Sequence, residues 1–214
     1  MNAALAPDPI PAGAAAHLRA ADPVLGALVE RIGEISVEVE TDLWWSLVDA
    51  IVSQQLSIRA AAMILARVRS LEPSGAAPSP ELLLGTEDDR LRSLGLSRAK
   101  VTYVKDLAAR WLDGSLEQDA LPRMDDEAVI ERLVQVKGIG RWTAEMALIF
   151  SLGRPDVLPL DDLGLRVAAL EAYGLAERPG REELTRLGEP WRPYRTAASL
   201  YLWRSRRIGG AGVG

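Results

Sequence analysis

The sequence has no cysteine and a single histidine, His17, among its 214 residues. Without cysteine the chain can form no disulfide, hold no iron–sulfur cluster through thiolates and use no thiol nucleophile. One histidine also argues against a Ser-His-Asp triad and against a zinc site built from several histidines. Any catalytic chemistry therefore falls to carboxylates, hydroxyls, lysines or the backbone.

Long apolar runs are missing as well. No stretch approaches the roughly 18 apolar residues of a membrane span. The N-terminal stretch MNAALAPDPIPAGAAA lacks the basic and apolar regions of a signal peptide. We therefore expect a cytoplasmic protein (nucleoid-associated if bacterial) with a partly flexible N-terminal tail. Its composition, 48% hydrophobic and 26% charged, is typical of a globular chain with one or two domains.

An excess of positive charge is also lacking: the net charge is −5 and the pI about 5.1. This argues mildly against a nucleic-acid partner. The charge is uneven, however, because residues 1–50 hold eight acids and two arginines, whereas residues 191–207 hold five arginines and no acid. A basic face that meets a phosphate backbone is thus compatible with the acidic total.

What the sequence does contain is helical periodicity. Apolar residues spaced three and four apart, with polar caps and Gly or Pro stops, predict an all-α fold of about ten helices. The segment EISVEVE (34–40) alternates as a strand does, but it is short and has no evident partner strand. The expected helices cover 24–32, 43–71 (as two helices, or one broken near 54–57), segments that follow the caps Ser79, Thr86 and Ser97, and then 127–136, 141–152, 162–173, 181–188 and 194–206.

A tight helical hairpin is expected at 134–144, VQVKGIGRWTA, where Asp125 or Asp126 caps the first helix. Its two glycines suit positive φ angles and close backbone approach, with Ile139 as a hydrophobic plug between the helices. The amides at the start of the second helix lack intrahelical acceptors and lie at the positive end of its dipole, which favours a phosphate. An ordinary turn between two helices is the alternative.

Together with LPLDD at 158–162, this hairpin resembles the helix–hairpin–helix and the proline- and aspartate-containing loop of the HhH-GPD superfamily of DNA glycosylases. Asp162 lies 24 residues beyond Gly138, a separation similar to that in AlkA-type 3-methyladenine DNA glycosylases (glycosylase II). The segments AIVSQQLS (50–57), GLSRAKVTYVKDLA (95–108) and WRPYRTAASLYLW (191–203) resemble the same branch, in the expected order. The resemblance covers roughly residues 43–206.

The resemblance implies two helical lobes with the hairpin at the cleft between them. One lobe is expected at 43–152, and the other combines 1–42 with 153–214 and carries the catalytic aspartate. Because only about forty residues precede the match, we expect no N-terminal β-domain.

The activity implied is that of a monofunctional glycosylase of base excision repair. It hydrolyses the N-glycosidic bond of alkylated purines, such as 3-methyladenine and 7-methylguanine, flipped out of duplex DNA, and leaves an abasic site. The resemblance implies that Asp162 is the catalytic residue and that its carboxylate stabilises an oxocarbenium-like sugar, while the cationic base leaves without a general acid. Asp161 is the rival, but the apolar residue expected three positions later matches Leu165, not Gly164. Asp162 also suits an N-cap, and both roles can coexist.

Trp142 stands where family members that cut the DNA strand carry a lysine, so the resemblance implies no lyase activity. Trp142, Trp203, Met146 and Leu163 are expected to line the base pocket, where aromatic faces attract a cationic base. The alternative for Met146 and Leu163 is an ordinary place in the helical core.

The remaining expectations concern DNA and ions. We expect double-stranded DNA with alkylated bases as the partner, no membrane and a monomer. A non-catalytic DNA-binding module, or a glycosylase for another lesion, is the alternative. No cofactor is expected beyond a monovalent cation (Na+ or K+) at the main-chain carbonyls of Val134, Val136 and Gly138. The wedge that replaces the flipped base is expected at Gln54, Gln55 and Leu56, with Gln55 or Leu56 as the filling side chain. The expected DNA contacts are Lys137, Gly138, Ile139, Gly140, Arg141 and Thr143.

Overall fold

The structure is a computed structural model that describes residues 8–209, with side chains up to Arg206. Within this range it is all-helical, as predicted, and residues 34–40 form no strand. None of the described helices is long and apolar enough to cross a membrane. The elements are α1 (Ala14–Ala21), α2 (Pro23–Ile32), α3 (Leu43–Ser53), α4 (Ile58–Arg69), α5 (Pro80–Gly85), α6 (Asp88–Ser93), α7 (Arg98–Leu112), the 3-10 turn η1 (Leu121–Arg123), α8 (Asp126–Leu133), α9 (Arg141–Phe150), α10 (Leu163–Tyr173), α11 (Arg181–Gly188) and α12 (Arg195–Gly209).

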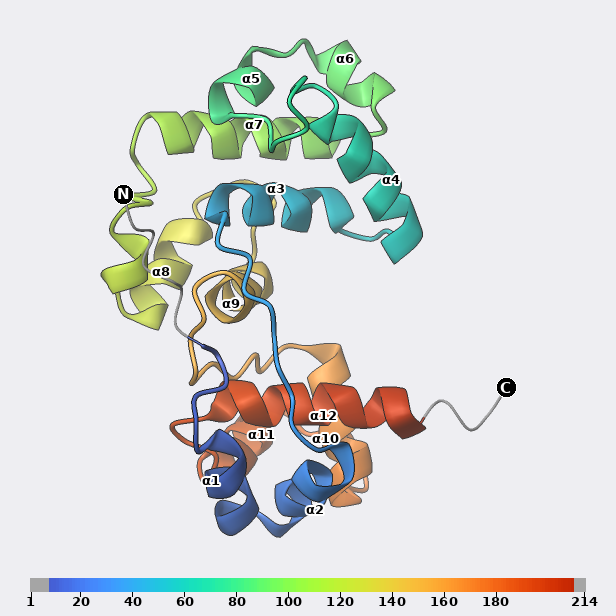
Figure 1. Ribbon diagram of the computed structural model, residues 1–214, viewed down its shortest axis with the longest axis vertical. Helices are drawn as coiled ribbons and strands as arrows, with labels where there is room; N and C mark the ends of the chain where they lie inside the picture. Colours follow the sequence, from blue (N-terminus) through green and yellow to red (C-terminus); the bar gives the residue numbers. More distant parts are fainter. Residues whose placement is uncertain (1–7, 210–214) are drawn as a thin grey trace. The chain divides into compact units, whose positions relative to one another are not determined.

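The chain forms two compact units (Figure 1). The first unit joins the residues up to Thr41 with those from Leu148 onward, and the second unit runs from Asp42 to Ala147. The division therefore falls inside α9, whereas the sequence placed it after that helix, at residue 152. An apolar helix that runs through both units gives no compositional signal at the point where they part.

In the first unit, α12 packs against α2 and α10, and α1 packs against α2. The expected partly flexible tail was wrong for its last residues, because α1 begins at Ala14, and Ala14 and Leu18 are fully buried; residues 1–7 of that tail lie outside the described residues. A buried carboxylate joins these elements: Asp22 caps α2 through Oδ1, and its Oδ2 accepts hydrogen bonds from Tyr173 Oη (2.5 Å) and Trp191 Nε1 (3.0 Å). This network joins the start of α2 to the end of α10 and to the segment between α11 and α12.

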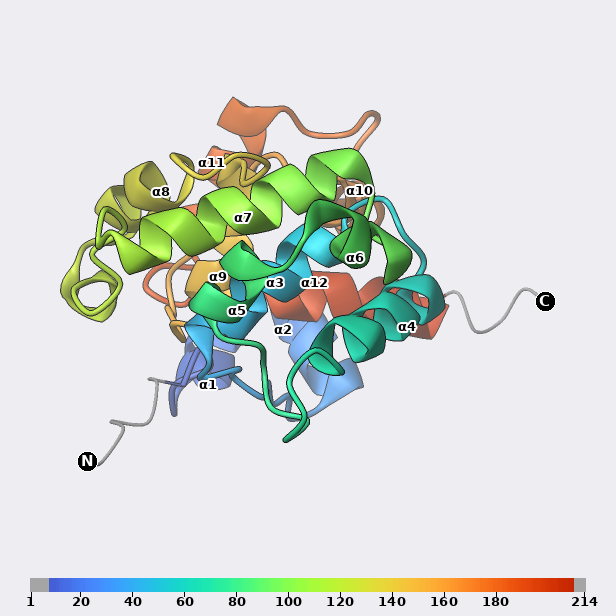
Figure 2. The same ribbon diagram turned by 90° about the horizontal axis from the view of Figure 1, so that it is seen from above.

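In the second unit, α7 lies along α5 and also packs against α3 (Figure 2). The aromatic pair on α3 is buried, and Trp44 Nε1 donates to the carbonyl of Pro78 at 2.8 Å. The ring of Trp44 also meets the ring of Trp111 on α7, with centroids 5.3 Å apart, so α7 is held against α3, the helix that ends at the 54–57 segment.

Most of the predicted helix caps are confirmed. Ser79, Ser97 and Asp125 each accept a hydrogen bond from the amide three residues later. Thr86 is the exception. It ends α5, and its hydroxyl donates back to Leu82, while α6 begins after Glu87 with no side-chain cap. A threonine can bond either forward or backward along the chain, and sequence spacing does not distinguish the two.

Candidate active site

Asp162 is the N-cap of α10. Its Oδ1 accepts a hydrogen bond from the amide of Leu165 at 2.5 Å, as the capping alternative predicted. The amide of Asp162 itself donates to Pro159 O at 3.0 Å, so the segment from Pro159 to Asp162 is a turn that leads directly into the helix. The carboxylate is thereby held in a fixed position at the N-terminus of a helix.

Trp203 on α12 fixes the same carboxylate from a second element. Its indole Nε1 donates to Asp162 Oδ1 at 2.9 Å, and its ring stacks on Phe150 with centroids 6.4 Å apart. Gly164 leaves room for this contact, because a Cβ there would lie 3.2 Å from Asp162 Oδ1 and 3.7 Å from the Trp203 ring. The sequence pointed to Trp203 as a pocket wall. It gave no signal for the hydrogen bond or for Phe150, because both contacts join residues far apart in the chain.

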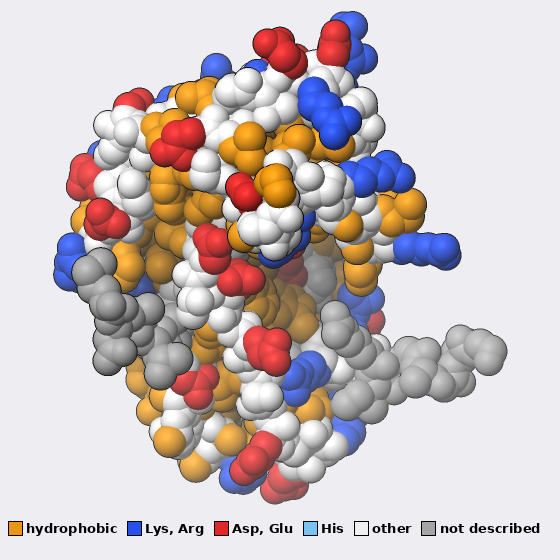
Figure 3. All heavy atoms as spheres, turned by 45° about the horizontal axis from the view of Figure 1, so that its top comes forward, with side chains coloured by type: hydrophobic (Ala, Val, Ile, Leu, Met, Phe, Trp, Pro, Cys, Tyr) orange, Lys and Arg blue, Asp and Glu red, His pale blue; other side chains and the backbone are white. Residues whose placement is uncertain are grey.

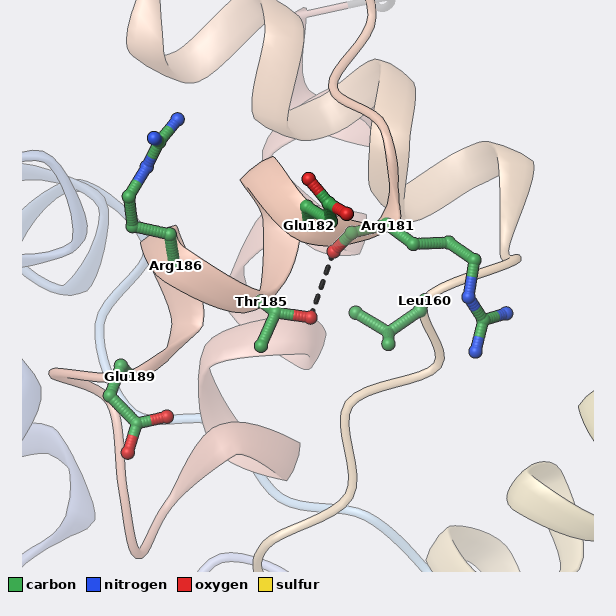
Figure 4. A pocket seen from close by; sticks show the side chains of 6 residues that line it. All are labelled: Leu160, Arg181, Glu182, Thr185, Arg186 and Glu189. Atoms are coloured by element: carbon green, nitrogen blue, oxygen red, sulfur yellow. Dashed lines mark hydrogen bonds between the residues drawn. The ribbon is translucent and has the colours of Figure 1, made fainter.

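Asp161, the rival acid, has a different environment. It is exposed and forms an ion pair with Arg181 at the start of α11. Arg181 also borders a hollow of about 580 Å³ on α11 (Figure 4). None of the predicted site residues lines this hollow, whose walls are Leu160, Arg181, Glu182, Thr185, Arg186 and Glu189. The two adjacent aspartates thus have different environments. Asp162 is held by Trp203 and the start of α10, and Asp161 pairs with a surface arginine.

The other predicted pocket residues are divided between the two units. Leu163 lies beside Asp162 in the first unit, and 58% of it is exposed, so it is not a core residue. Trp142 and Met146 lie one turn apart on α9 in the second unit, which places them on the same face of the helix. Trp142 is 47% exposed and Met146 is partly buried. These residues offer apolar and aromatic surface instead of filling the core.

The hairpin has the close backbone approach that its glycines predicted. Gly138 has φ of +83°, and a Cβ there would lie 2.2 Å from Cδ2 of Tyr103, so the ring of Tyr103 occupies the space of a side chain. Around Gly140, by contrast, a Cβ would meet nothing within 4 Å. Ile139 is buried, as expected of the plug.

Some hairpin amides are already used inside the protein. Ile139 N donates to Val136 O at 3.1 Å, and Lys137 N donates to the carboxylate of Asp106 at 3.0 Å. The amides of Gly138 and Gly140 donate to no acceptor within residues 8–209. An anion at this hairpin is therefore expected to bind the two glycine amides.

The charged side chains of the hairpin are paired. The guanidinium of Arg141 binds both carboxylate oxygens of Glu127 at 2.6 and 2.8 Å and one oxygen of Glu145 at 3.1 Å. The hydrogen bond to Glu127 raises the pKa of Arg141 above its ordinary value. Lys137 Nζ lies 3.5 Å from Asp106 and stays mostly exposed. Acidic and basic side chains are also interspersed over the face drawn in Figure 3.

These contacts change the interpretation of two predicted DNA contacts. Thr143 is buried, so its side chain is not available to DNA, which corrects the prediction. The guanidinium of Arg141 is bound by two acids and offers little net positive charge to a phosphate. Lys137 and the glycine amides are the accessible groups.

The predicted wedge segment is a tight turn. Leu56 N donates to Ser53 O at 3.2 Å, Gln54 has φ −51° and ψ 129°, and Gln55 has φ 57°, which are the angles of a type II β-turn. Gln55 and Leu56 are exposed at this turn. Gln54 points the other way, and its side-chain Nε2 donates to Gly138 O of the hairpin at 2.7 Å.

Two of the three main-chain carbonyls predicted to bind a cation already accept hydrogen bonds. Val136 O accepts from Ile139 N, and Gly138 O accepts from Gln54 Nε2. Each carbonyl oxygen has a second lone pair, so these bonds leave room for one further contact apiece. Residues 8–209 hold no group of three or more acidic or histidine side chains placed to bind a metal.

Comparison with known proteins adds the family. Residues 48–193 match the model of the HhH-GPD superfamily base excision DNA repair proteins. The DNA-3-methyladenine glycosylase 1 of Schizosaccharomyces pombe is 36% identical over 197 residues, which cover 90% of this chain and 86% of that protein.

Solved structures of similar proteins indicate the same family. A DNA-3-methyladenine glycosidase from Bacillus halodurans superposes with a TM-score of 0.86 at 37% identity, covering 95% of this chain and 93% of that one. The S. pombe 3-methyladenine DNA glycosylase in complex with abasic DNA superposes with a TM-score of 0.80 at 36% identity, covering 91% and 96%. A carboxylate at a helix start and a glycine hairpin with two available amides thus lie in a fold shared with these proteins, and the chain belongs to the HhH-GPD superfamily of base excision DNA repair proteins.

Proposed function

We propose that the protein is an alkylbase DNA glycosylase and that Asp162 is its catalytic residue. The observation that carries the proposal is the fixed carboxylate of Asp162, bonded to Trp203 Nε1 and to the amide of Leu165 in a chain of this superfamily. A carboxylate oriented before substrate binds stabilises positive charge on a sugar without reorganisation during the reaction. The relatives named DNA-3-methyladenine glycosylase support alkylated purines as the substrates.

The chemistry divides between protein and substrate. As the bond between C1′ and the base breaks, its electron pair leaves with the base, and the sugar becomes an oxocarbenium-like cation beside Asp162. A purine alkylated at N3 or N7 is already cationic and leaves as a neutral base, so no general acid is needed to protonate it. Water then adds to C1′ and loses a proton, which leaves an abasic site.

The exposed aromatic surfaces suit this substrate. Trp142, Trp203, Met146 and Leu163 are the residues proposed to contact the flipped base, because indole faces attract a cationic base. Trp142 has no amine to form a Schiff base with the sugar, so the proposed activity, that of a DNA-3-methyladenine glycosylase II, does not include strand cleavage.

The hairpin is proposed to bind the DNA backbone, and the turn at Ser53–Leu56 is proposed to fill the gap that the flipped nucleotide leaves in the duplex. The amides of Gly138 and Gly140 bind a phosphate, Lys137 adds charge, and Gln55 or Leu56 fills the gap left by the flipped nucleotide. A Na+ or K+ ion is proposed at the carbonyls of Val134, Val136 and Gly138, where it would add positive charge beside that phosphate. The protein is proposed to act as a monomer in the cytoplasm.

The test compares wild type with Asp162→Asn in base release from methylated duplex DNA. The amide keeps an oxygen for Trp203 and Leu165 but loses the negative charge, so release is expected to fall by at least roughly 100-fold. Binding to abasic-site DNA is followed in parallel and is expected to persist. Treatment of the products with and without alkali separates base loss from strand cleavage, and strand breaks are expected only after alkali.

Two outcomes contradict the proposal. If wild type and Asp162→Asn both bind DNA and neither releases a methylpurine, the protein is a binder or acts on another lesion. If Asp162→Asn releases bases at the wild-type rate, the catalytic carboxylate lies elsewhere, and Asp161→Asn becomes the next variant to measure.

A further inference from the structure

The turn Ser53–Leu56 holds a glutamine in a backbone conformation that usually requires glycine. Gln55 has φ of 57°, one of two positive φ angles at non-glycine positions in the described chain. Position three of a type II turn favours glycine because a Cβ crowds the backbone there. Since nothing in the turn itself favours glutamine, the surrounding structure must hold this conformation.

A lysine from a different helix supplies one restraint. Lys100 on α7 donates from Nζ to Val52 O at 2.7 Å and to Gln54 O at 2.8 Å. Val52 O lies in the last turn of α3, where free carbonyls and the helix dipole attract a cation. Gln54 O belongs to the central peptide of the turn. The ammonium thus ends α3 and fixes the peptide that sets the orientation of Gln55.

A second restraint joins the turn to the hairpin. The side-chain amide of Gln54 donates to Gly138 O at 2.7 Å across 84 residues of sequence. Gly138 is itself held by the ring of Tyr103, which lies on α7 one turn beyond Lys100. Turn, hairpin and α7 therefore form one connected set of contacts within the second unit.

We propose that Lys100 and Gln54 are positioning residues that hold Gln55 in register with the phosphate-binding hairpin. This inference rests on the proposed function. In a duplex whose phosphate is held by the glycine amides, the gap left by the flipped nucleotide lies at a fixed distance along the double helix. The rigid turn places the side chain of Gln55 at that distance, so gripping the backbone and filling the gap become one event. Neither Lys100 nor Gln54 needs to touch the reacting sugar or base.

A positioning role of this kind predicts a dependence on base pairing that a general structural role does not. Filling the gap matters most when the opposite base has lost its partner inside an intact duplex. It matters little when the methylated base is in single-stranded DNA, where no stacked gap has to be filled. Loss of Lys100 or Gln54 should therefore slow release from duplex and spare release from single strands.

The experiment measures single-turnover release of a methylpurine from paired duplex and from the same strand alone. Lys100→Met removes the ammonium, and Gln54→Leu removes the amide at similar size. The matched control is Lys105→Met, because Lys105 lies on the same helix but pairs with Asp88 away from the turn. On duplex, Gln54→Leu, which loses one hydrogen bond, is expected to be roughly tenfold slower, and Lys100→Met, which loses two, at least that much slower. On single strands all three variants are expected to match wild type, and thermal unfolding checks that they fold.

A double variant tests whether Lys100 acts through the turn. If it does, adding Lys100→Met to Gln55→Ala leaves duplex release as slow as Gln55→Ala alone. Additive losses, or equal losses on duplex and single strand, overturn the inference while the proposed function stands. If wild type releases no base from either substrate, the proposed function fails and the inference fails with it.

Discussion

The two turns of the second unit, at Ser53–Leu56 and at Lys137–Gly140, each contain a residue with an unusual backbone angle, but the type of residue differs. Both contain a positive φ, at Gln55 and at Gly138. At the hairpin, the space where a side chain would stand is filled by Tyr103. At the other turn, the residue with positive φ is exposed and carries a long polar side chain. Glycine occurs where another group approaches the backbone, and a glutamine with positive φ occurs where the side chain is exposed.

The comparison also separates two ways of tolerating an unusual backbone angle. Gly138 has no Cβ, so the angle is cheap and the gain is the close packing of Tyr103. Gln55 is held in place by bonds from outside the turn, chiefly those of Lys100 to Gln54 O and Val52 O. One conformation is intrinsic to the residue, and the other is imposed by its neighbours.

The largest predicted effect breaks the hairpin. Gly138→Ala places a methyl group inside the ring of Tyr103 and a Cβ at positive φ, so we expect a loss of about 3 kcal/mol. That corresponds to a fall of roughly 10 °C in the unfolding midpoint, followed by circular dichroism. Gly140→Ala is the control, because its Cβ would meet nothing within 4 Å and its φ is not positive. Equal midpoints for the two variants would contradict the role assigned to Tyr103.

The next prediction introduces a glycine instead of removing one, and the expected change in stability has the opposite sign. Gln55→Gly relieves the strain of the turn and is expected to leave stability unchanged or raise it by up to about 1 kcal/mol. The same change removes the side chain proposed to fill the duplex, so methylpurine release from duplex should slow. Gln55→Ala removes that side chain but keeps a Cβ, so it should slow release without the gain in midpoint. A loss of stability in Gln55→Gly would show that the turn is not strained.

The smallest predicted effect is a pH dependence at Asp106, which supports the hairpin from α7. Burial alone would raise the pKa of Asp106, but the hydrogen bonds from the Lys137 amide and from Arg110 outweigh it and hold the pKa below its usual value. Its stabilising contribution is therefore present at neutral pH and is lost as pH falls through the lowered pKa. Asp106→Asn should lower the unfolding midpoint at pH 7, with the gap to wild type narrowing toward pH 3. A gap that does not change with pH would exclude this linkage.

Local rules were enough for much of the fold. The caps at Ser79, Ser97 and Asp125 follow from residue type and spacing, because the bonds that they make span only three residues. The first helix was missed because its apolar residues are nearly all alanines, which show no clear periodicity, and Leu18 is the one large apolar side chain in α1. The end of α3 and the glycine hairpin were located because breaks in periodicity are themselves local.

The site was predicted less completely, because its important contacts are long-range. The sequence pointed to Asp162 and Trp203 separately but not to the bond between them. Glu145 lies four residues after Arg141, so that pair was visible in the spacing, whereas the pairing with Glu127 depends on how α8 and α9 meet. Lys100 carried no signal at all, since its acceptors are backbone carbonyls from another helix.

The bond between Trp203 and Asp162 has a consequence for anyone who redesigns this protein. Under the proposed function, one indole is both a wall that selects the base and the group that orients the reactive carboxylate. A change at position 203 meant to admit a larger adduct also removes the hydrogen bond to Asp162, so substrate selectivity and turnover rate change together. Leu163, whose exposed aliphatic side chain has no hydrogen-bond donor for the carboxylate, is the position at which substrate range can be varied separately.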